Sequence, residues 1–290
     1  MRQNTQGIFF VLLAYVSWGV LPLFWKQLDS VPATDILAHR ILWSSVFMLI
    51  LCLLLKRDYL RKYFSNRKTL GKLFITGVLV SINWGVFIYA VNTEQVIETS
   101  LGYFINPLVS IVLGMVFLGE KMNKTQILAF LLAMAGVAYL TINYGHFPWI
   151  AIVLAFSFGV YGLLKKTMSL DSMSALAVET TLLAPLSIGY LILGTSEAGA
   201  SFITQPNSII LMLILAGVVT ALPLYWFGIA TGKMPLYSIG FFQYIAPTIS
   251  LFLGIHLFHE TFSPTHAVAF SFIWAGLALY IGDMMIKLRK

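Results

Sequence analysis

Two stretches of this chain, 98–121 and 238–261, repeat one pattern. At an offset of 140 residues, four distinctive positions coincide: Pro107 with Pro247, Ser110 with Ser250, Gly114 with Gly254 and Glu120 with Glu260. Each stretch is apolar and long enough to cross a bilayer, which takes about 20 residues. A proline inside a helix frees the carbonyl four residues back, and a membrane tolerates a free carbonyl only beside protein or a wet cavity. The pattern therefore predicts two interrupted helices that face each other beside a cavity.

Apolar runs of similar length fill the rest of the chain. Ten can be marked: 7–25, 34–55, 72–92, 99–118, 125–143, 148–164, 174–194, 208–229, 236–258 and 265–286. Only 10% of the residues are charged, against about 25% in soluble domains. The single cysteine, Cys52, excludes an intrachain disulfide. We expect an all-α polytopic membrane protein with ten transmembrane helices in a lipid bilayer.

The 140-residue offset extends over the whole chain. The letters SWGV at 17–20 fall on SFGV at 157–160, and Gly, Phe and Ala matches follow in the third and fifth runs. Residues 1–143 and 144–290 are therefore predicted to be two five-helix repeats. Because five is odd, the second repeat must cross the membrane in the opposite sense. Inverted repeats are the architecture of many secondary transporters, with the substrate site near the midplane between the halves.

Basic residues indicate the orientation. If the N-terminus is cytoplasmic, the inside segments hold sixteen of the 18 lysines and arginines, Arg40 lies within a run, and the outside loops hold Lys26 alone. Positive charge is concentrated in cytoplasmic loops of membrane proteins. Both termini are therefore expected in the cytoplasm. The net charge of +7 follows from these loops, and we expect no nucleic-acid partner.

Polar and aromatic residues of the repeated helices are the candidates for a substrate pathway. Tyr103, Asn106, Gln243 and Tyr244 are expected to line the pathway, and Pro107 and Pro247 to shape it. Close packing of helices explains the serines and glycines of the same faces equally well. Three tryptophans deeper in their runs, Trp18, Trp84 and Trp226, suit an aromatic cavity for an organic molecule, although tryptophans that face lipid are the simpler explanation.

Ionisable residues inside apolar runs are functional candidates because burying charge in a membrane is costly. His39 and Arg40 lie in the second run, and Glu179 occupies the position of His39 in the second repeat. These residues are candidates for binding substrate charge or for carrying a coupling proton. The alternative is that they point to headgroups from near a span end. Glu98 is assigned to an outer loop, and Glu120 to the interface, contacting basic residues or a neighbouring helix end.

Several motifs of energy-coupled and hydrolytic enzymes do not occur. The sequence has no G-x-x-x-x-G-K-[ST], no H-E-x-x-H and no G-x-S-x-G. His256, His259 and Glu260 have metal-ligand spacing, but no further ligand accompanies them and an interfacial cluster is the better interpretation. We predict no cofactor, no metal site and no enzymatic activity.

Four motifs carry a resemblance to a known family: WGVLPLFWK at 18–26, ILAHRILW at 36–43, YFINPLV at 103–109 and QYIAPT at 243–248. With the ten spans and the repeat, they resemble the RarD branch of the EamA family, in the drug/metabolite transporter superfamily. The resemblance implies a bacterial inner-membrane permease that exports small organic metabolites or drugs such as chloramphenicol-like compounds. It does not supply site residues.

Two other functions are compatible with the sequence. A passive facilitator or channel would share the spans. An intramembrane lipid-modifying enzyme would use His39 and Glu179 as acid and base, although catalysis rarely needs two matched halves. The oligomeric state is open between a monomer and a homodimer.

Overall fold

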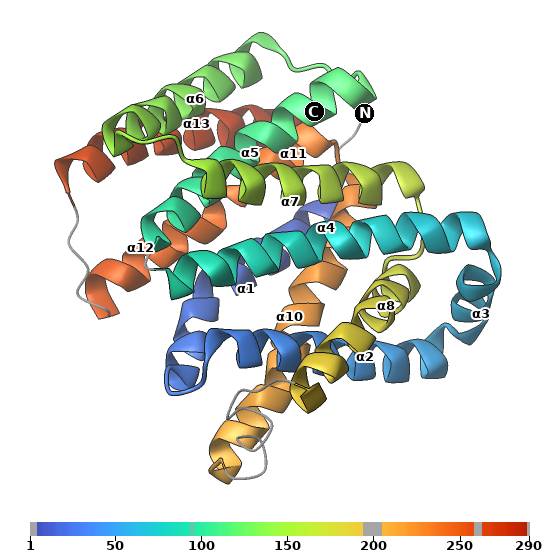
Figure 1. Ribbon diagram of the computed structural model, residues 1–290. Helices are drawn as coiled ribbons and strands as arrows, with labels where there is room; N and C mark the ends of the chain where they lie inside the picture. Colours follow the sequence, from blue (N-terminus) through green and yellow to red (C-terminus); the bar gives the residue numbers. More distant parts are fainter. Residues whose placement is uncertain (1–4, 94, 194–204, 258–262, 289–290) are drawn as a thin grey trace.

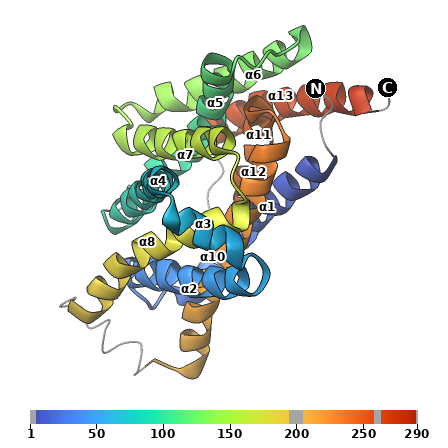
Figure 2. The same ribbon diagram turned by 90° about the vertical axis from the view of Figure 1, so that its right-hand side faces the viewer.

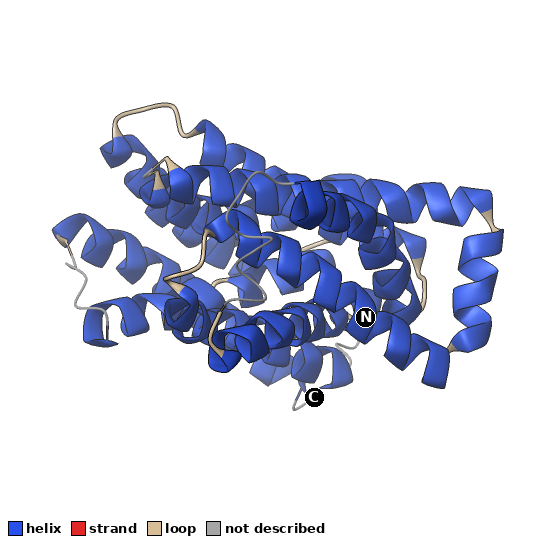
Figure 3. Ribbon diagram, turned by 60° about the horizontal axis from the view of Figure 1, so that its bottom comes forward, coloured by secondary structure: helices blue, strands red, loops and turns tan. Residues whose placement is uncertain are grey.

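The computed structural model describes residues 5–93, 95–193, 205–257 and 263–288, and this part of the chain is helical without any strand (Figure 3). Its elements are α1 (Thr5–Trp25), η1 (Lys26–Leu28), α2 (Ala33–Leu55), α3 (Arg57–Ser65), α4 (Arg67–Asn92), α5 (Val96–Leu118), α6 (Lys124–Tyr144), α7 (Trp149–Met168), α8 (Ser172–Leu193), α10 (Asn207–Lys233), α11 (Leu236–Gln243), α12 (Ile245–Leu257) and α13 (Pro264–Leu288).

Ten segments among the described residues are long and apolar enough to cross a membrane, which confirms the predicted all-α fold with ten spans. The helix α3 was not expected, because the sequence between the second and third runs was assigned to a cytoplasmic loop. Leu60 and Tyr63 of α3 are three residues apart and both buried. This spacing puts them on one face of a helix, and that face covers the end of the bundle.

The two proline-bearing spans differ. Pro247 interrupts the ninth span, which is divided at Tyr244 into α11 and α12. Pro107 lies inside α5, which is continuous, so the predicted interruption is wrong for the fourth span. The two spans contact each other directly, since a Cβ atom added to Gly240 would lie 2.8 Å from the carbonyl oxygen of Pro107. The expected cavity therefore does not lie between them at this level.

The helices pack as a bundle in which α6 and α13 form one edge and α2, α8 and α10 the opposite edge (Figures 1 and 2). We call the side on which α1 begins and α13 ends the terminal side, and the side of η1 the distal side. The helix α3 joins α2 to α4 on the terminal side, at the right-hand edge of Figure 1.

Glycines allow the closest helix contacts. A Cβ atom on Gly136 of α6 would lie 2.6 Å from the carbonyl oxygen of Ala269 in α13, and one on Gly276 of α13 would lie 2.6 Å from that of Ala129 in α6. Real side chains do not approach so closely. Small residues at such crossings let helix backbones pack in membranes, where dispersion forces provide much of the association energy.

Candidate functional site

A cavity of about 630 Å³ opens on the distal side. Its wall comes from the end of α1, the η1 segment, the first turns of α2 and the distal part of α4, including Trp25, Ile36, Arg40 and Phe87. Most wall residues are apolar. Its size falls within the roughly 300–1,000 Å³ typical of small-molecule sites. We call it the distal cavity.

Arg40 is the charged residue at the deep end of the distal cavity. It lies seven residues into α2, about 10 Å along the axis at about 1.5 Å per residue. Its guanidinium carbon is 4.8 Å from the ring centroid of Trp25 and 4.9 Å from that of Trp84. Its Nε donates a hydrogen bond of 3.0 Å to Thr220 Oγ1 on α10. Tyr103 of α5 is also close enough to interact electrostatically with Arg40. The neighbours of this cation therefore come from four helices other than its own: α1, α4, α5 and α10.

On the terminal side of Arg40, five aromatic rings from three helices pack together at the centre of the bundle: Tyr15, Trp18, Phe158, Tyr161 and Phe227. The ring centroids of Trp18 and Phe227 are 5.9 Å apart, and those of Tyr161 and Phe227 are 6.0 Å apart with nearly parallel planes. Such ring pairs add to the stabilisation from burial. This aromatic cluster separates the distal cavity from the terminal side.

Glu179 lies on the terminal side of the aromatic cluster and is almost fully buried. Lys165 Nζ is 3.1 Å from Glu179 Oε1, Thr76 donates a 2.7 Å hydrogen bond to the same oxygen, and Tyr161 donates one of 3.3 Å to Oε2. We call these four residues the Glu179 cluster. The sequence indicated Glu179 as a candidate for substrate charge or proton coupling, with a position facing the headgroups as the alternative, and assigned Lys165 to a cytoplasmic loop. That assignment is wrong, because Lys165 lies in the last turn of α7 and points into the bundle.

The other predicted charged residue, His39, does not line the distal cavity. It is buried, and its Nδ1 accepts a 3.3 Å hydrogen bond from Trp43, one turn further on. Asp35, one turn before it, is also buried and accepts a 2.9 Å hydrogen bond from Tyr190 of α8. The sequence analysis missed Asp35, although a carboxylate in the first turn of a span was a visible signal.

The remaining pathway candidates are spread over several environments. Asn106 accepts a 3.3 Å hydrogen bond from Ser110 of its own helix. The Tyr15 hydroxyl lies next to Gln243, but neither that hydroxyl nor Gln243 Oε1 makes a hydrogen bond of good geometry in the described part of the chain. Tyr244 is buried in a cluster with Phe104 and Phe270, away from the distal cavity. Trp226 is partly buried against the core, and Pro107 and Pro247 act on the helices as described above.

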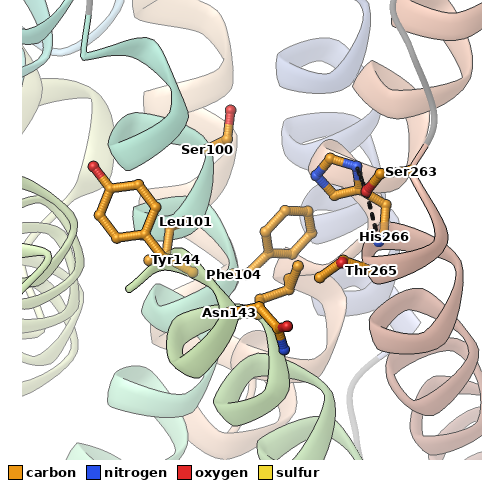
Figure 4. Close-up of a pocket in the computed structure, with 9 residues that line it drawn as sticks. Ser100, Leu101, Phe104, Asn143, Tyr144, Ser263, Thr265 and His266 are labelled. Atoms are coloured by element: carbon orange, nitrogen blue, oxygen red, sulfur yellow. Dashed lines mark hydrogen bonds between the residues drawn. The ribbon is translucent and has the colours of Figure 1, made fainter. Parts of the chain in front are cut away.

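A second, smaller cavity of about 260 Å³ lies between α5, α6 and the start of α13, also on the distal side (Figure 4). Leu101 and Phe104 come from α5, and Asn143 and Tyr144 from the end of α6. His266 and Ser263 are hydrogen-bonded to each other at 3.1 Å on the opposite wall. We call it the lateral cavity.

Two glutamates at the ends of α5 bind the amino termini of neighbouring helices. Glu98 is buried and accepts hydrogen bonds from Ile150 N of α7 and from the Tyr144 hydroxyl, so its assignment to a loop is wrong. Glu120 accepts hydrogen bonds from Leu236 N and Tyr237 N at the start of α11, as expected for a residue contacting a helix end. Carboxylates at these positions also compensate the helix dipole. Glu260 and His259 lie outside the described residues.

Outside the spans, Lys56 and Asp171 link the end of α2 to the start of α8, with 3.4 Å between Nζ and Oδ1. Burial acts to raise the pKa of Asp171, but hydrogen bonds from Ser174 N and Oγ and the charge of Lys56 outweigh it and lower the pKa. The charge of Asp171 in turn raises the pKa of Lys56. Both groups are therefore ionised at neutral pH and hold this corner of the terminal side.

Comparison with known proteins gives a consistent result. The EamA-like transporter family matches residues 5–142. The uncharacterized transporter YojE of Bacillus subtilis is 45% identical over 96% of this chain and 94% of its own length. The protein RarD of Escherichia coli is 39% identical over 100% of this chain and 98% of its own length. A chloramphenicol-sensitive protein RarD of Pseudomonas aeruginosa is 28% identical over 100% of this chain.

The fold is also that of a solved structure. A protein of known crystal structure superimposes with a TM-score of 0.73 at 17% identity, covering 96% of this chain and 98% of that one. At this identity the match concerns the fold alone. Together with the ten spans and the full-length relatives, the comparisons show that this chain is a multi-pass membrane transporter that belongs to the EamA-like transporter family, in the branch of the RarD proteins.

Proposed function

We propose that the protein is a secondary transporter of the bacterial inner membrane that exports small organic molecules, with both termini in the cytoplasm. Two inverted five-span halves, 1–143 and 144–290, alternate between a state open on the distal side and one open on the terminal side. The distal side is then periplasmic. Of the sixteen basic residues predicted in cytoplasmic segments, fifteen still support this orientation once Lys165 is placed inside the bundle.

Reciprocal contacts support the inverted repeat. At the 140-residue offset, the contact of Gly136 with Ala269 has the same partners as that of Gly276 with Ala129, and both would bring a Cβ atom to 2.6 Å. Gly19 likewise approaches Ile249 as Gly159 approaches Val109, at 2.7 and 2.8 Å. A two-fold axis in the membrane plane relates such pairs in inverted-repeat transporters.

One observation carries the proposal of alternating access: the distal side is hollow where the repeat-related positions of the terminal side are filled. Ile36 and Phe87 line the distal cavity. Their counterparts, Leu176 and Phe227, are 2% and 0% exposed. Trp25, at the cavity wall, corresponds to Lys165, which is buried against Glu179. A passive channel would need openings on both sides at once.

The lateral cavity has a filled counterpart too. Leu101 and Leu140 on its wall correspond to Phe241 and Tyr280, whose rings stack with centroids 4.1 Å apart. His266 corresponds to Gln126, which donates a 2.9 Å hydrogen bond to Asp283. Both hollow regions thus lie on one side, and both filled ones on the other. We infer that opening the terminal side requires separation of the Glu179 cluster and of the Asp283 contacts.

The substrate pathway proposed here runs from the distal cavity past Arg40, Trp84 and Tyr103 to Trp18 of the aromatic cluster. Glu179 closes its terminal side, and proton coupling through Glu179 or His39 is part of the proposal. Asn106, Gln243 and Tyr244 are placed on helices that must move against each other. Flux of chloramphenicol into proteoliposomes against its gradient, driven by an imposed pH gradient, distinguishes a coupled carrier from a passive facilitator.

Labelling of two repeat-related cysteines tests the alternating access without any substrate. In a Cys52→Ser background, Ile36→Cys should react rapidly with a membrane-impermeant maleimide added from the distal side. Leu176→Cys should react from the terminal side at least about tenfold more slowly, because the state open on that side is the minor one and a minor state is populated to roughly 0.1–10%. The measurement is mass spectrometry of the labelled protein in sealed vesicles of each orientation.

Two outcomes would overturn this proposal. Equal labelling of the two cysteines would mean that the terminal side is as open as the distal side. Labelling of both cysteines from a single side would contradict the inverted repeat. An exposed residue of α3, Arg61→Cys, reports the membrane orientation of each vesicle preparation and serves as the control.

A further inference from the structure

We propose that the distal cavity binds a small organic anion, a carboxylate attached to a planar apolar body, and that the Arg40 guanidinium binds the acidic group. This assignment rests on the proposed transport function and names its substrate class. It is carried by three properties of the site: the fixed position of the guanidinium, its unused donors and the apolar wall around it.

The guanidinium of Arg40 is held from three sides. The rings of Trp25 on α1 and Trp84 on α4 lie 4.8 and 4.9 Å from its central carbon, and Thr220 on α10 accepts the hydrogen bond from Nε. Attraction of a cation to an aromatic face holds it in place without neutralising its charge. The orientation of the guanidinium is therefore fixed before a ligand arrives.

The terminal amino groups of this guanidinium are still available. In the described part of the chain the one hydrogen bond of Arg40 uses Nε, and no carboxylate lies within ion-pair distance of it. A cation within a membrane span is normally paired or placed in a wet cavity. The planar fork of an arginine matches the two oxygens of a carboxylate. A ligand carboxylate would supply the missing partner.

Among the described residues, the carboxylates nearest to the distal cavity do not pair with Arg40. Asp29 lies at the mouth of the cavity, but Lys26 is 3.6 Å away from it and both side chains are exposed. Asp35 is turned towards Tyr190 of α8, and Glu179 is neutralised by Lys165 on the other side of the aromatic cluster. An anion entering the distal cavity therefore meets the positive charge of Arg40 at its deep end, while Asp29, the carboxylate of the wall, lies at the mouth.

The wall of the cavity determines the rest of the ligand. Leu28, Val31, Ile36 and Ile88 form an apolar lining, and the rings of Phe87 and Tyr103 lie 6.3 Å apart beside Arg40. Aromatic rings favour contact with another flat apolar group. About 630 Å³ accommodates one or two rings with a short acidic side chain. A neutral compound would leave the Arg40 donors unpaired.

Matched pairs of acids and amides test this assignment. Each pair has one shape and differs in charge: phenylacetate and phenylacetamide, 4-phenylbutyrate and its amide, and 1-naphthylacetate and its amide. Binding to the purified protein in detergent is measured by isothermal titration calorimetry, and thermal stabilisation by circular dichroism. At least one acid should bind about 10- to 100-fold more tightly than its amide, as expected for hydrogen bonds to a charged group.

Variants of Arg40 and its neighbour make the test specific. Arg40→Gln should reduce the acid-to-amide ratio to about one, while Arg40→Lys should retain part of it because the charge remains. Thr220→Val keeps the guanidinium but removes the acceptor for Nε, and should weaken acid binding less than Arg40→Gln does. Helix content and gel-filtration profile show whether each variant is folded.

The proposal is overturned if no acid in the panel binds better than its amide, or if Arg40→Gln keeps the wild-type preference. The labelling of Ile36→Cys and Leu176→Cys is independent of any ligand. Asymmetric labelling without acid preference refutes the substrate class and leaves the transport function standing. Acid preference with equal labelling refutes alternating access instead.

Discussion

Replacing Lys165 by methionine is expected to lower the free energy of unfolding by about 3–5 kcal/mol, the cost of leaving one partner of a buried ion pair uncompensated. The Glu179 and Lys165 side chains are 3% and 5% exposed. Methionine keeps most of the lysine stem, so loss of packing contributes little. Unfolding is followed by circular dichroism in a mild detergent with increasing denaturant.

The double variant Lys165→Met/Glu179→Gln separates charge from packing. Thr76 and Tyr161 contact the two carboxylate oxygens; glutamine can accept from one of these hydroxyls with its carbonyl oxygen and donate to the other with its amide, and the pair leaves no charge buried. We expect the double variant to recover more than half of the lost stability, since a buried ion pair replaced as a unit often costs little. A double variant as unstable as Lys165→Met alone would show that the carboxylate itself is required.

The same cluster is expected to control the terminal side. Glu179→Gln in the Leu176→Cys background should increase maleimide labelling from the terminal side, because the ion pair that holds α7 and α8 together is lost. Labelling of Ile36→Cys from the distal side should fall in parallel if the two states exchange. If neither the labelling rate of Leu176→Cys nor that of Ile36→Cys changes, the Glu179 cluster stabilises the fold but does not control the opening of the terminal side.

Replacing Gly217 by alanine is expected to destabilise the protein by about 1–3 kcal/mol, the typical cost of overpacking. A Cβ atom at this position would lie 2.3 Å from the carbonyl carbon of Trp43 and 2.5 Å from Ser44 N. These are backbone atoms, so α10 and α2 would have to separate. The 2.9 Å hydrogen bond from Ser44 Oγ to the Gly217 carbonyl would also be strained.

Gly217→Ala is also expected to affect ligand binding in the distal cavity. Thr220 lies three residues after Gly217, and Arg40 lies three residues before Trp43. Both are therefore within one helical turn of the crossing of α10 and α2, and their distance depends on it. We expect Gly217→Ala to weaken acid binding by moving the acceptor away from Arg40 Nε. Gly189→Ala on α8 is the matched control, because nothing lies within 4 Å of its Cβ position. It should be neutral or stabilising by up to about 1 kcal/mol, since alanine favours a helix. Destabilisation of both variants by the same amount would contradict the packing argument.

The sequence predicted the spans better than the contacts between them. Ten apolar runs were recognised because burial in a membrane depends on the composition of each segment, which can be read locally. Glu120 was correctly expected to contact a helix end, since a carboxylate after an apolar run has few other partners there. The break at Tyr244 was expected from Pro247, but α5 accommodates Pro107 without interruption. The loss of the hydrogen bond to the carbonyl four residues before a proline applies to both helices, so this rule does not distinguish them.

The site shows the same division. Sequence alone singled out His39, Arg40 and Glu179 as ionisable residues inside apolar runs, but left open whether they face a cavity or the headgroups. Only the tertiary structure gave Arg40 its two tryptophans and Thr220, and gave Glu179 its partner Lys165. Those partners come from helices far apart along the chain, and which side chains meet depends on how closely the helices cross. That distance is set by glycine contacts such as the one between Gly217 and Trp43, where one methyl group would separate the helices.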